Sequence, residues 1–293
     1  MRGKKSIHIT ESPRDAQQGL PFVILPAKRA QYINALLKVG FDVIDFGSFV
    51  STRAVPQMDD QQKVLEDVEK SGSETRLMAV VGNLRGGIDA ADQNKLDIIG
   101  FPFSISATFL KKNINSDPLQ ALSIIDGLLE ICNGRGKELR IFLSMAFGNP
   151  YGDFYNKEIL SETIGKLNAK GILEITLADT IGCSSPAQIS ETLEFLQAGF
   201  PRMQFGLHIH TRPHDAAAKL AAAWQAGCRS FDGVLNGIGG CPMTGYEMIG
   251  NINTFELLAF CQKTHISHAL DKKALQKASE VADAIFRNLP DPV

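Results

Sequence analysis

The chain has 293 residues, 44% of them hydrophobic and 21% charged, which is the composition of a globular protein with a sizeable core and the length of one barrel-type α/β domain. Its formal net charge of −2 gives no electrostatic basis for binding nucleic acid or an anionic membrane surface. It has no apolar run long enough to span a bilayer.

The cysteines and the first residues of the chain bear on the cellular compartment in which the protein is expected. The sequence has five cysteines, an odd number with no Cys-x-x-Cys pair, so neither a disulfide framework nor a thiolate zinc site is indicated. The basic residues 1–5 run directly into a strand-like segment, without the apolar stretch of a signal peptide. We therefore expect a cytoplasmic protein in a reducing environment.

Short β-branched and apolar runs alternate with segments of helical periodicity along the chain. Strands are predicted at 5–10, 42–46, 76–81, 97–103, 139–144, 172–177, 203–208 and 230–235. Helices are predicted between them at 28–39, 57–70, 87–95, 118–132, 157–169, 186–196, 214–226 and 253–261. Eight strands that alternate with eight helices predict a closed (β/α)8 TIM barrel.

The domain organisation follows from this alternation. The whole chain, 1–293, is expected to form one catalytic barrel domain, with 268–293 as a helical extension whose amphipathic segment 271–287 packs against the barrel. An open doubly wound sheet would place a glycine-rich turn after the first strand, but residues 11–15 contain no G-x-G-x-x-G. No nicotinamide, flavin or pyridoxal cofactor is expected.

Two histidines near the end of the seventh strand indicate a metal site. His208 and His210 lie one residue apart, and strand side chains alternate, so both imidazoles point to the same side. Polar residues stand at the carboxyl ends of the other strands, which is the active end of a barrel of this type. These residues are Arg14, Asp15, Asp45, Ser48, Asn83, Ser104, Ser106, Ser144, Asp179, Thr180 and Asn236.

A cation could be held by Asp15 and the two histidines together with an amide oxygen from Asn251 or Asn236. Such a shell of carboxylate, amide and imidazole ligands favours an octahedral Mg²⁺ or Mn²⁺ site with positions open to water or substrate. Zinc and cobalt stay open as alternatives. A His-x-His pair that holds no metal is the simplest competing interpretation.

Two further residues carry possible chemistry. Arg14, beside the carboxylate, could face a developing oxyanion, or it could serve only as an ion-pair partner of Asp15 or Asp179. Cys241 lies in a glycine-rich run, 236–241, with the composition of a mobile loop over the site. Its thiol could donate a proton, or it could be an inert small side chain in a turn.

Several motifs together resemble one known family. They are Ser12 to Gln18 (SPRDAQQ), Phe49-Val50-Ser51 with Val55-Pro56-Gln57-Met58, Lys111 to Asn115 (KKNIN), Asp179 to Gly182 (DTIG) and Gly239 to Asn251. In this order they look like 3-hydroxy-3-methylglutaryl-CoA (HMG-CoA) lyase, within the wider superfamily of metal-dependent barrel Claisen lyases and synthases. The resemblance covers about residues 11–258.

The resemblance implies a reaction and roles for named residues. The reaction is the metal-dependent retro-Claisen cleavage of HMG-CoA, an acyl-CoA substrate, to acetyl-CoA and acetoacetate. The implied catalytic residues are Arg14, Asp15, His208 and Cys241, and Asp15, His208, His210 and Asn251 would hold the Mg²⁺ or Mn²⁺ ion. The substrate pocket would be shaped by Gln18, Asp45, Ser48, Asp179 and Thr180. A homo-oligomer is possible, with no nucleic-acid or membrane partner.

The chain also departs from the family pattern. It has Thr211-Arg212 where an aspartate usually follows the second histidine, Ser106-Ala107-Thr108 where a glutamate is usual, and an atypical stretch at 243–249. The acyl group therefore stays open. The alternatives are a related aldolase or acyl-CoA lyase acting on another 3-hydroxyacyl-CoA or 4-hydroxy-2-oxo acid, and a barrel that has lost its activity.

Overall fold

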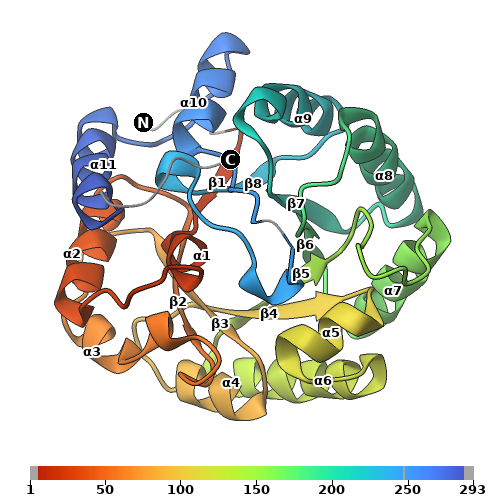
Figure 1. Ribbon diagram of the computed structural model, residues 1–293, viewed down its shortest axis with the longest axis horizontal. Coiled ribbons are helices and arrows are strands. Elements are labelled where there is room, and N and C mark those ends of the chain that lie inside the picture. Colours follow the sequence, from red (N-terminus) through yellow and green to blue (C-terminus); the bar gives the residue numbers. More distant parts are fainter. Residues whose placement is uncertain (1–5, 247, 287–293) are drawn as a thin grey trace.

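The computed structural model describes residues 6–246 and 248–286, and its centre is a closed parallel barrel (Figure 1). The strands pair in chain order from β1 to β8, and β1 closes the barrel by pairing with β8. The predicted (β/α)8 TIM barrel is therefore confirmed. The strands are β1 (His8–Glu11), β2 (Val43–Phe49), β3 (Arg76–Val81), β4 (Ile98–Ser104), β5 (Glu138–Ser144), β6 (Glu174–Asp179), β7 (Gln204–Ile209) and β8 (Ser230–Gly233).

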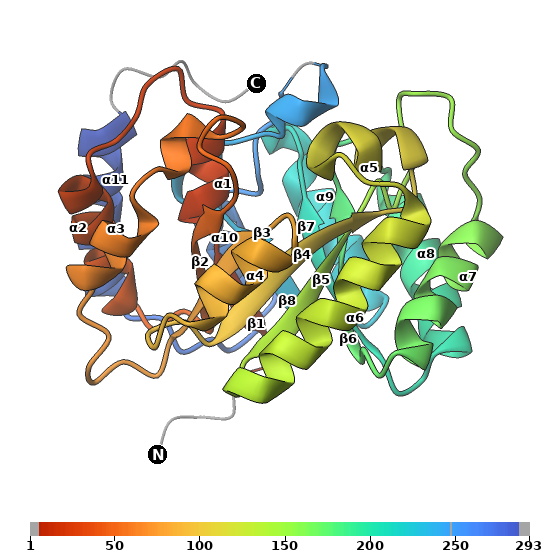
Figure 2. The same cartoon turned by 90° about the horizontal axis from the view of Figure 1, so that it is seen from below.

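Helices surround the barrel, and several short ones lie at the carboxyl ends of the strands (Figures 1 and 2). The α-helices are α1 (Pro13–Gln18), α2 (Pro26–Leu37), α3 (Gln61–Glu66), α4 (Leu84–Ala91), α5 (Ala107–Ile114), α6 (Pro118–Arg135), α7 (Lys157–Ala169), α8 (Pro186–Gly199), α9 (Pro213–Gln225), α10 (Thr254–Lys263) and α11 (Lys272–Phe286). Short 3₁₀ turns are η1 (Pro56–Met58), η2 (Leu235–Gly237) and η3 (Pro242–Thr244).

The local structure differs from the predictions at three places. The helix predicted at 57–70 is divided into η1 and α3, because Asp60 adopts a left-handed conformation with φ of 51°. Helices α1 and α5 occupy segments for which no helix or strand was predicted. Each is short and carries a local start signal, Pro13 in the first turn of α1 and a Ser106 side chain that caps α5.

Strand β2 contains an irregularity that matters for the site. Its register with β3 shifts between Asp45 and Gly47. Asp45 and Ser48 are three residues apart, a spacing that puts side chains on opposite faces of a regular strand. A bulge resets this alternation, which allows Asp45 to contact Arg14 and Ser48 to line the central cavity.

The main hydrophobic core lies between the barrel and its helices, and a smaller cluster fills the barrel interior. The interior cluster consists of Val43, Met78, Val80, Ile98 and Phe142. Within residues 6–246 and 248–286, no helix combines the length and the apolar content needed to cross a bilayer.

The predicted C-terminal helix is present as α11. It packs against α2, where the rings of Tyr32 and Phe286 meet edge to face with centroids 6.1 Å apart. The rest of the predicted extension, 287–293, lies outside the described residues, as do residues 1–5, of which the last begins the first predicted strand.

A buried carboxyl group ties the end of β1 to the segment after β8. Glu11 is fully buried, and it accepts hydrogen bonds from the Leu235 N–H and the Thr254 hydroxyl, each at 2.6 Å. Burial raises the pKa of Glu11 from 4.5 to about 8, although both hydrogen bonds oppose the shift. The carboxyl group is therefore mainly protonated in the folded protein at neutral pH.

We predict that this proton makes the stability depend on pH. Between pH 4.5 and about pH 8 the folded chain binds a proton at Glu11 that the unfolded chain has lost, so the free energy of unfolding falls as the pH rises across this interval. Glu11→Gln keeps an acceptor for Leu235 and removes this titration. Thermal unfolding from about pH 5 to about pH 9 should give a shallower decline of Tm for Glu11→Gln than for the wild type. Parallel curves would contradict the assignment.

Candidate active site and metal centre

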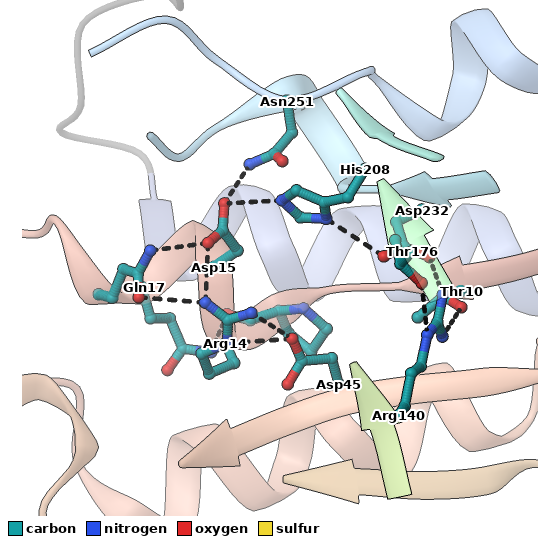
Figure 3. Close-up of polar contacts among 12 residues, drawn as sticks. Thr10, Arg14, Asp15, Gln17, Asp45, Arg140, Thr176, His208, Asp232 and Asn251 are labelled. Carbon is teal, nitrogen blue, oxygen red and sulfur yellow. Dashed lines mark hydrogen bonds and ion pairs between the residues drawn. The ribbon is translucent and has the colours of Figure 1, made fainter. Parts of the chain in front are cut away.

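The first turn after β1 places two charged residues over the barrel. The Ser12 N–H donates to the Gly233 carbonyl at 2.9 Å, which fixes the start of α1 against β8. Pro13 then occupies the first turn of α1, where the missing N–H costs nothing. The next two residues, Arg14 and Asp15, are both buried at this end of the barrel (Figure 3).

The two histidines come from the end of β7. Just beyond β7, the backbone of residues 209–211 pairs with that of residues 250–252, including an antiparallel bridge between His210 and Asn251. This pairing brings Asn251 from the segment after β8 beside the histidines. The Asn251 Nδ2 atom donates to Asp15 Oδ2 at 2.7 Å (Figure 3).

The carboxylate and the two imidazoles converge as the sequence predicted. Asp15 Oδ2 lies 3.9 Å from His208 Nε2 and 4.0 Å from His210 Nε2. These separations are too long for hydrogen bonds, and the three ligand atoms lie within 4.8 Å of one another. Three buried donors that face one point without bonding to each other fit a divalent cation, and the absence of a thiolate among these three suits a hard ion.

The orientation of Asn251 bears on the fourth predicted ligand. An amide binds a metal through oxygen, whereas here the nitrogen faces Asp15 and also donates to the Ile238 carbonyl at 3.0 Å. Ligation by Asn251 would require its amide group to turn. Its side chain is already beside the carboxylate, so the turn is a local movement.

A second layer of charges orients His208, and the sequence analysis missed it. His208 Nδ1 lies 3.2 Å from Asp232 Oδ2, and Arg140 donates to the other Asp232 oxygen at 2.8 Å (Figure 3). Arg140 is held in turn by the hydroxyls of Thr10 and Thr176. A carboxylate on the second nitrogen is the usual partner of a metal-binding histidine. The available signal was a charged residue inside each of two apolar strands, β5 and β8, because a buried charge needs a partner.

The pKa shifts of Asp15 and His210 suit a metal site. Burial by itself raises the pKa of a carboxyl group, but Arg14 and the two imidazoles outweigh it and lower the pKa of Asp15 below its ordinary value. Burial lowers the pKa of His210. Burial has the same tendency at His208, but the hydrogen bond with Asp232 and the negative charges of Asp15 and Asp232 together outweigh it and raise the pKa. Asp15 is thus ionised and His210 neutral at neutral pH, as ligands must be.

The Arg14 guanidinium donates hydrogen bonds to two carboxylates, those of Asp15 and Asp45. Its Nε and Nη2 atoms donate to Asp45 Oδ2 at 3.0 and 2.6 Å, and Nη1 donates to Asp15 Oδ1 at 2.8 Å and to Gln18 Oε1 at 3.1 Å. The ion pair with Asp15 that was weighed as an alternative role is therefore present. One N–H of Nη2 has no hydrogen-bond partner among the described residues and can donate into the cavity.

One cavity unites the metal ligands with the other predicted residues. Of the predicted set, Arg14, Asp15, Gln18, Ser48, Thr180, His208, His210 and Cys241 all line it. Apolar residues, among them Val80 and Phe142, form much of the remaining wall. Burial raises the pKa of Cys241 to about 11, so its thiol is protonated at neutral pH.

Two residues expected in the substrate pocket do not line this cavity. Asp45 is fully buried behind Arg14, and its Oδ1 atom has no hydrogen-bond partner within residues 6–246 and 248–286. Asp179 accepts hydrogen bonds from the N–H groups of Cys183 and Ser184, so it shapes the turn after β6. Both were expected there from the family resemblance and because each stands at the carboxyl end of a predicted strand, but their contacts direct them into the wall.

Steric crowding beside Asp15 and Asn251 explains why position 239 in the glycine-rich run is a glycine. At Gly239, where φ is +131°, a Cβ atom would lie 2.3 Å from Asn251 Nδ2 and 3.1 Å from Asp15 Oδ2. Any larger residue would displace these side chains. Other residues of the polar rim have local roles: Asn83 and Ser106 cap helices, and Asn236 donates to Asp283 on α11.

Comparisons with known proteins agree with this geometry. The HMGL-like family model matches residues 6–282. The chain is 31% identical to a hydroxymethylglutaryl-CoA lyase of Bacillus subtilis over 98% of this chain and 95% of that protein. It is 29% identical to an (R)-citramalyl-CoA lyase of Chloroflexus aurantiacus over 95% of this chain and 90% of that protein.

A solved structure of an HMG-CoA lyase from Acinetobacter baumannii, in complex with coenzyme A and 3-methylmalate, superposes with a TM-score of 0.89 at 27% identity. The alignment covers 96% of this chain and 91% of that one. The chain therefore belongs to the HMGL-like family and is an HMG-CoA lyase-like carbon–carbon lyase.

Proposed function

We propose that this protein cleaves HMG-CoA to acetyl-CoA and acetoacetate with the help of a bound Mg²⁺ or Mn²⁺ ion. The observation that carries the proposal is the convergence of Asp15, His208 and His210 on the cavity that Arg14 and Cys241 also line. A retro-Claisen reaction needs these functions at one place. Residues from both ends of the chain supply them.

The reaction breaks the bond between C2 and C3 of the acyl chain, and each residue has a defined task in it. The hydroxyl group on C3 loses its proton to solvent in the open cavity as the C3 carbonyl of acetoacetate forms, and a cation held by Asp15, His208 and His210 would acidify this hydroxyl group. The free N–H of Arg14 donates to the thioester oxygen, where negative charge develops as the bond breaks. The protonated Cys241 thiol can supply a proton to C2 of the departing thioester enolate.

The cavity wall, the names of the relatives and the free cysteines support the proposals on substrate class and compartment. Ser48 and Thr180 add hydroxyl groups to an otherwise largely apolar wall, which can bind the polar end of a short acyl group. The substrate class proposed is an acyl-CoA, as for the relatives by name. All five cysteines are free, which supports a reducing, cytoplasmic compartment. The oligomeric state stays a prediction.

The first test is turnover of a thioester panel. Purified protein with Mg²⁺ or Mn²⁺ should release acetoacetate from HMG-CoA, measured together with the acetyl-CoA formed. Citramalyl-CoA belongs in the panel because one relative bears that name, and its cleavage would release pyruvate. Pyruvate without acetoacetate would move the assignment to the sibling reaction. No cleavage of any thioester would overturn the proposal.

Substitutions of Cys241 and Arg14 should show how much each side chain contributes to kcat. Cys241→Ala should lower kcat by about 10²–10⁴-fold through loss of the proton donor. Arg14→Gln should lower kcat by about 10²–10³-fold or more through loss of the oxyanion partner. Arg14→Lys is the matched control, because it keeps the charge between Asp15 and Asp45 but loses the fork. Circular dichroism should show a folded barrel in each case, and wild-type kcat in Cys241→Ala would exclude the thiol from the reaction.

The metal centre can be tested without turnover. Asp232→Asn should weaken Mn²⁺ binding by about 10–100-fold in calorimetric titration, because Asp232 orients His208. Asp126→Asn, which loses an exposed ion pair with Lys170, is the matched control and should bind Mn²⁺ as the wild type does. Equal affinity of Asp232→Asn and wild type would argue against a metal at His208.

A further inference from the structure

The connection between β5 and α7 forms a braced projection beside the cavity. Asn149 Oδ1 accepts hydrogen bonds from the N–H groups of Tyr151 and Asp153, both at 3.1 Å, and Asn149 Nδ2 donates to the Asp153 carbonyl at 2.8 Å. One side chain thus closes the turn 149–153 on itself. The turn can hold Tyr151 in a defined position.

The same turn is fastened to the start of α5. The Asp153 carboxylate accepts hydrogen bonds from the Ser106 hydroxyl at 2.6 Å and from the N–H and hydroxyl of Thr108 at 3.0 and 2.8 Å. This carboxylate comes from a loop far along the chain, and it binds the residues on either side of Ala107. Charge-assisted bonds at a helix N-terminus make a firm anchor.

Tyr151 extends from this anchor to the loop that carries Cys241. Its ring stacks on Phe109 with centroids 6.4 Å apart, and Lys112 Nζ lies 4.8 Å from the ring centroid. Its hydroxyl donates to the Thr244 carbonyl at 2.9 Å. Figure 2 shows α5, in yellow, beside the blue segment that contains η3, at the end of the barrel where α1 also lies.

Tyr246 makes the reciprocal contact. Its hydroxyl donates to the Pro150 carbonyl at 3.1 Å, and its ring meets the Tyr151 ring edge to face with centroids 6.0 Å apart. Each tyrosine therefore bonds to the backbone of the loop that carries the other. Tyr246 is 54% exposed, so burial alone does not explain its position, and it lies in the stretch 243–249 that departs from the family pattern.

The contact leads directly to Cys241. The Cys241 carbonyl accepts hydrogen bonds from the N–H and the hydroxyl of Thr244, at 3.2 and 2.9 Å. Thr244 is the residue whose own carbonyl is held by Tyr151. Gly245 follows with φ of +74°, which ends the turn and directs the chain to Tyr246.

We propose that Tyr151 and Tyr246 form a latch that holds the η3 turn against the β5–α7 connection and thereby positions the Cys241 thiol over the cavity. Both tyrosines are positioning residues that act through the turn. The turn that it holds contributes Cys241, Pro242 and Met243 to the lining of the cavity. The effect expected on catalysis rests on the proposed function, whereas the effect on the thiol does not.

The test measures how readily Cys241 is alkylated. Wild type, Tyr246→Phe and Tyr246→Ala are treated with iodoacetamide, and the labelled Cys241 peptide is quantified by mass spectrometry against the peptide of Cys183, an exposed thiol. Loss of one hydrogen bond in Tyr246→Phe should raise the Cys241 labelling rate by about three- to tenfold, and loss of the ring in Tyr246→Ala should raise it further. Tyr155→Phe is the matched control: it loses a phenol–carbonyl bond of 2.8 Å to Ala146 in the same connection, and should label as wild type.

The latch predicts a specific kinetic change as well. If Cys241 is misplaced, kcat for HMG-CoA should fall by about three- to tenfold in Tyr246→Phe with an unchanged KM, while Tyr155→Phe keeps the wild-type kcat. Labelling of Cys241 at the wild-type rate in both Tyr246 variants would overturn the latch. A protein that releases no acetoacetate but shows faster labelling in Tyr246→Phe would refute the proposed substrate and keep the latch.

Discussion

The Asp15 carboxylate is the charge on which the rest of the site depends. It is buried, and it receives hydrogen bonds from Arg14, Gln18 and Asn251 while it faces two imidazoles. A buried carboxylate is stable only when such partners surround it. These partners come from the segments that follow β1, β7 and β8, so the requirement to compensate one charge joins three distant parts of the chain.

The need to compensate buried charges also applies inside the barrel. His208 is oriented by Asp232, and Asp232 is compensated by Arg140, which crosses the interior to reach Thr10 on β1. Removing one partner from a buried network of this kind leaves the others uncompensated, so its members support stability and function together. On the other side of Arg14, Asp45 keeps one oxygen without a partner in the described part of the chain, and burial raises its pKa despite the guanidinium. The site is thus a series of acidic side chains separated by basic ones.

Sequence patterns predict where some of the site residues lie and leave the orientation of others open. The convergence of Asp15 with His208 and His210 was predictable, because strand ends in a parallel barrel meet at one rim and alternate residues share a face. The positions of Asp45 and Asp179 were not, because a rim residue can point into the cavity or into the wall behind it. The bulge in β2 sets the orientation of Asp45. Hydrogen bonds within the turn after β6 set the orientation of Asp179.

The sequence by itself determined the barrel and the order of its elements, and it indicated the residues proposed to carry the chemistry, since these follow from hydrophobic periodicity and from short motifs that are local along the chain. Only the tertiary structure decided which partners these residues have: the Asp232–Arg140 support of His208, the fork of Arg14 and the contact between Tyr151 and Tyr246. Arg140 and Asp232 lie 92 positions apart, and Arg14 and Asp45 lie 31 positions apart. The two tyrosines bond to loops that are more than ninety positions away along the chain. Their contact depends on register, bulges and loop geometry, which local patterns do not encode.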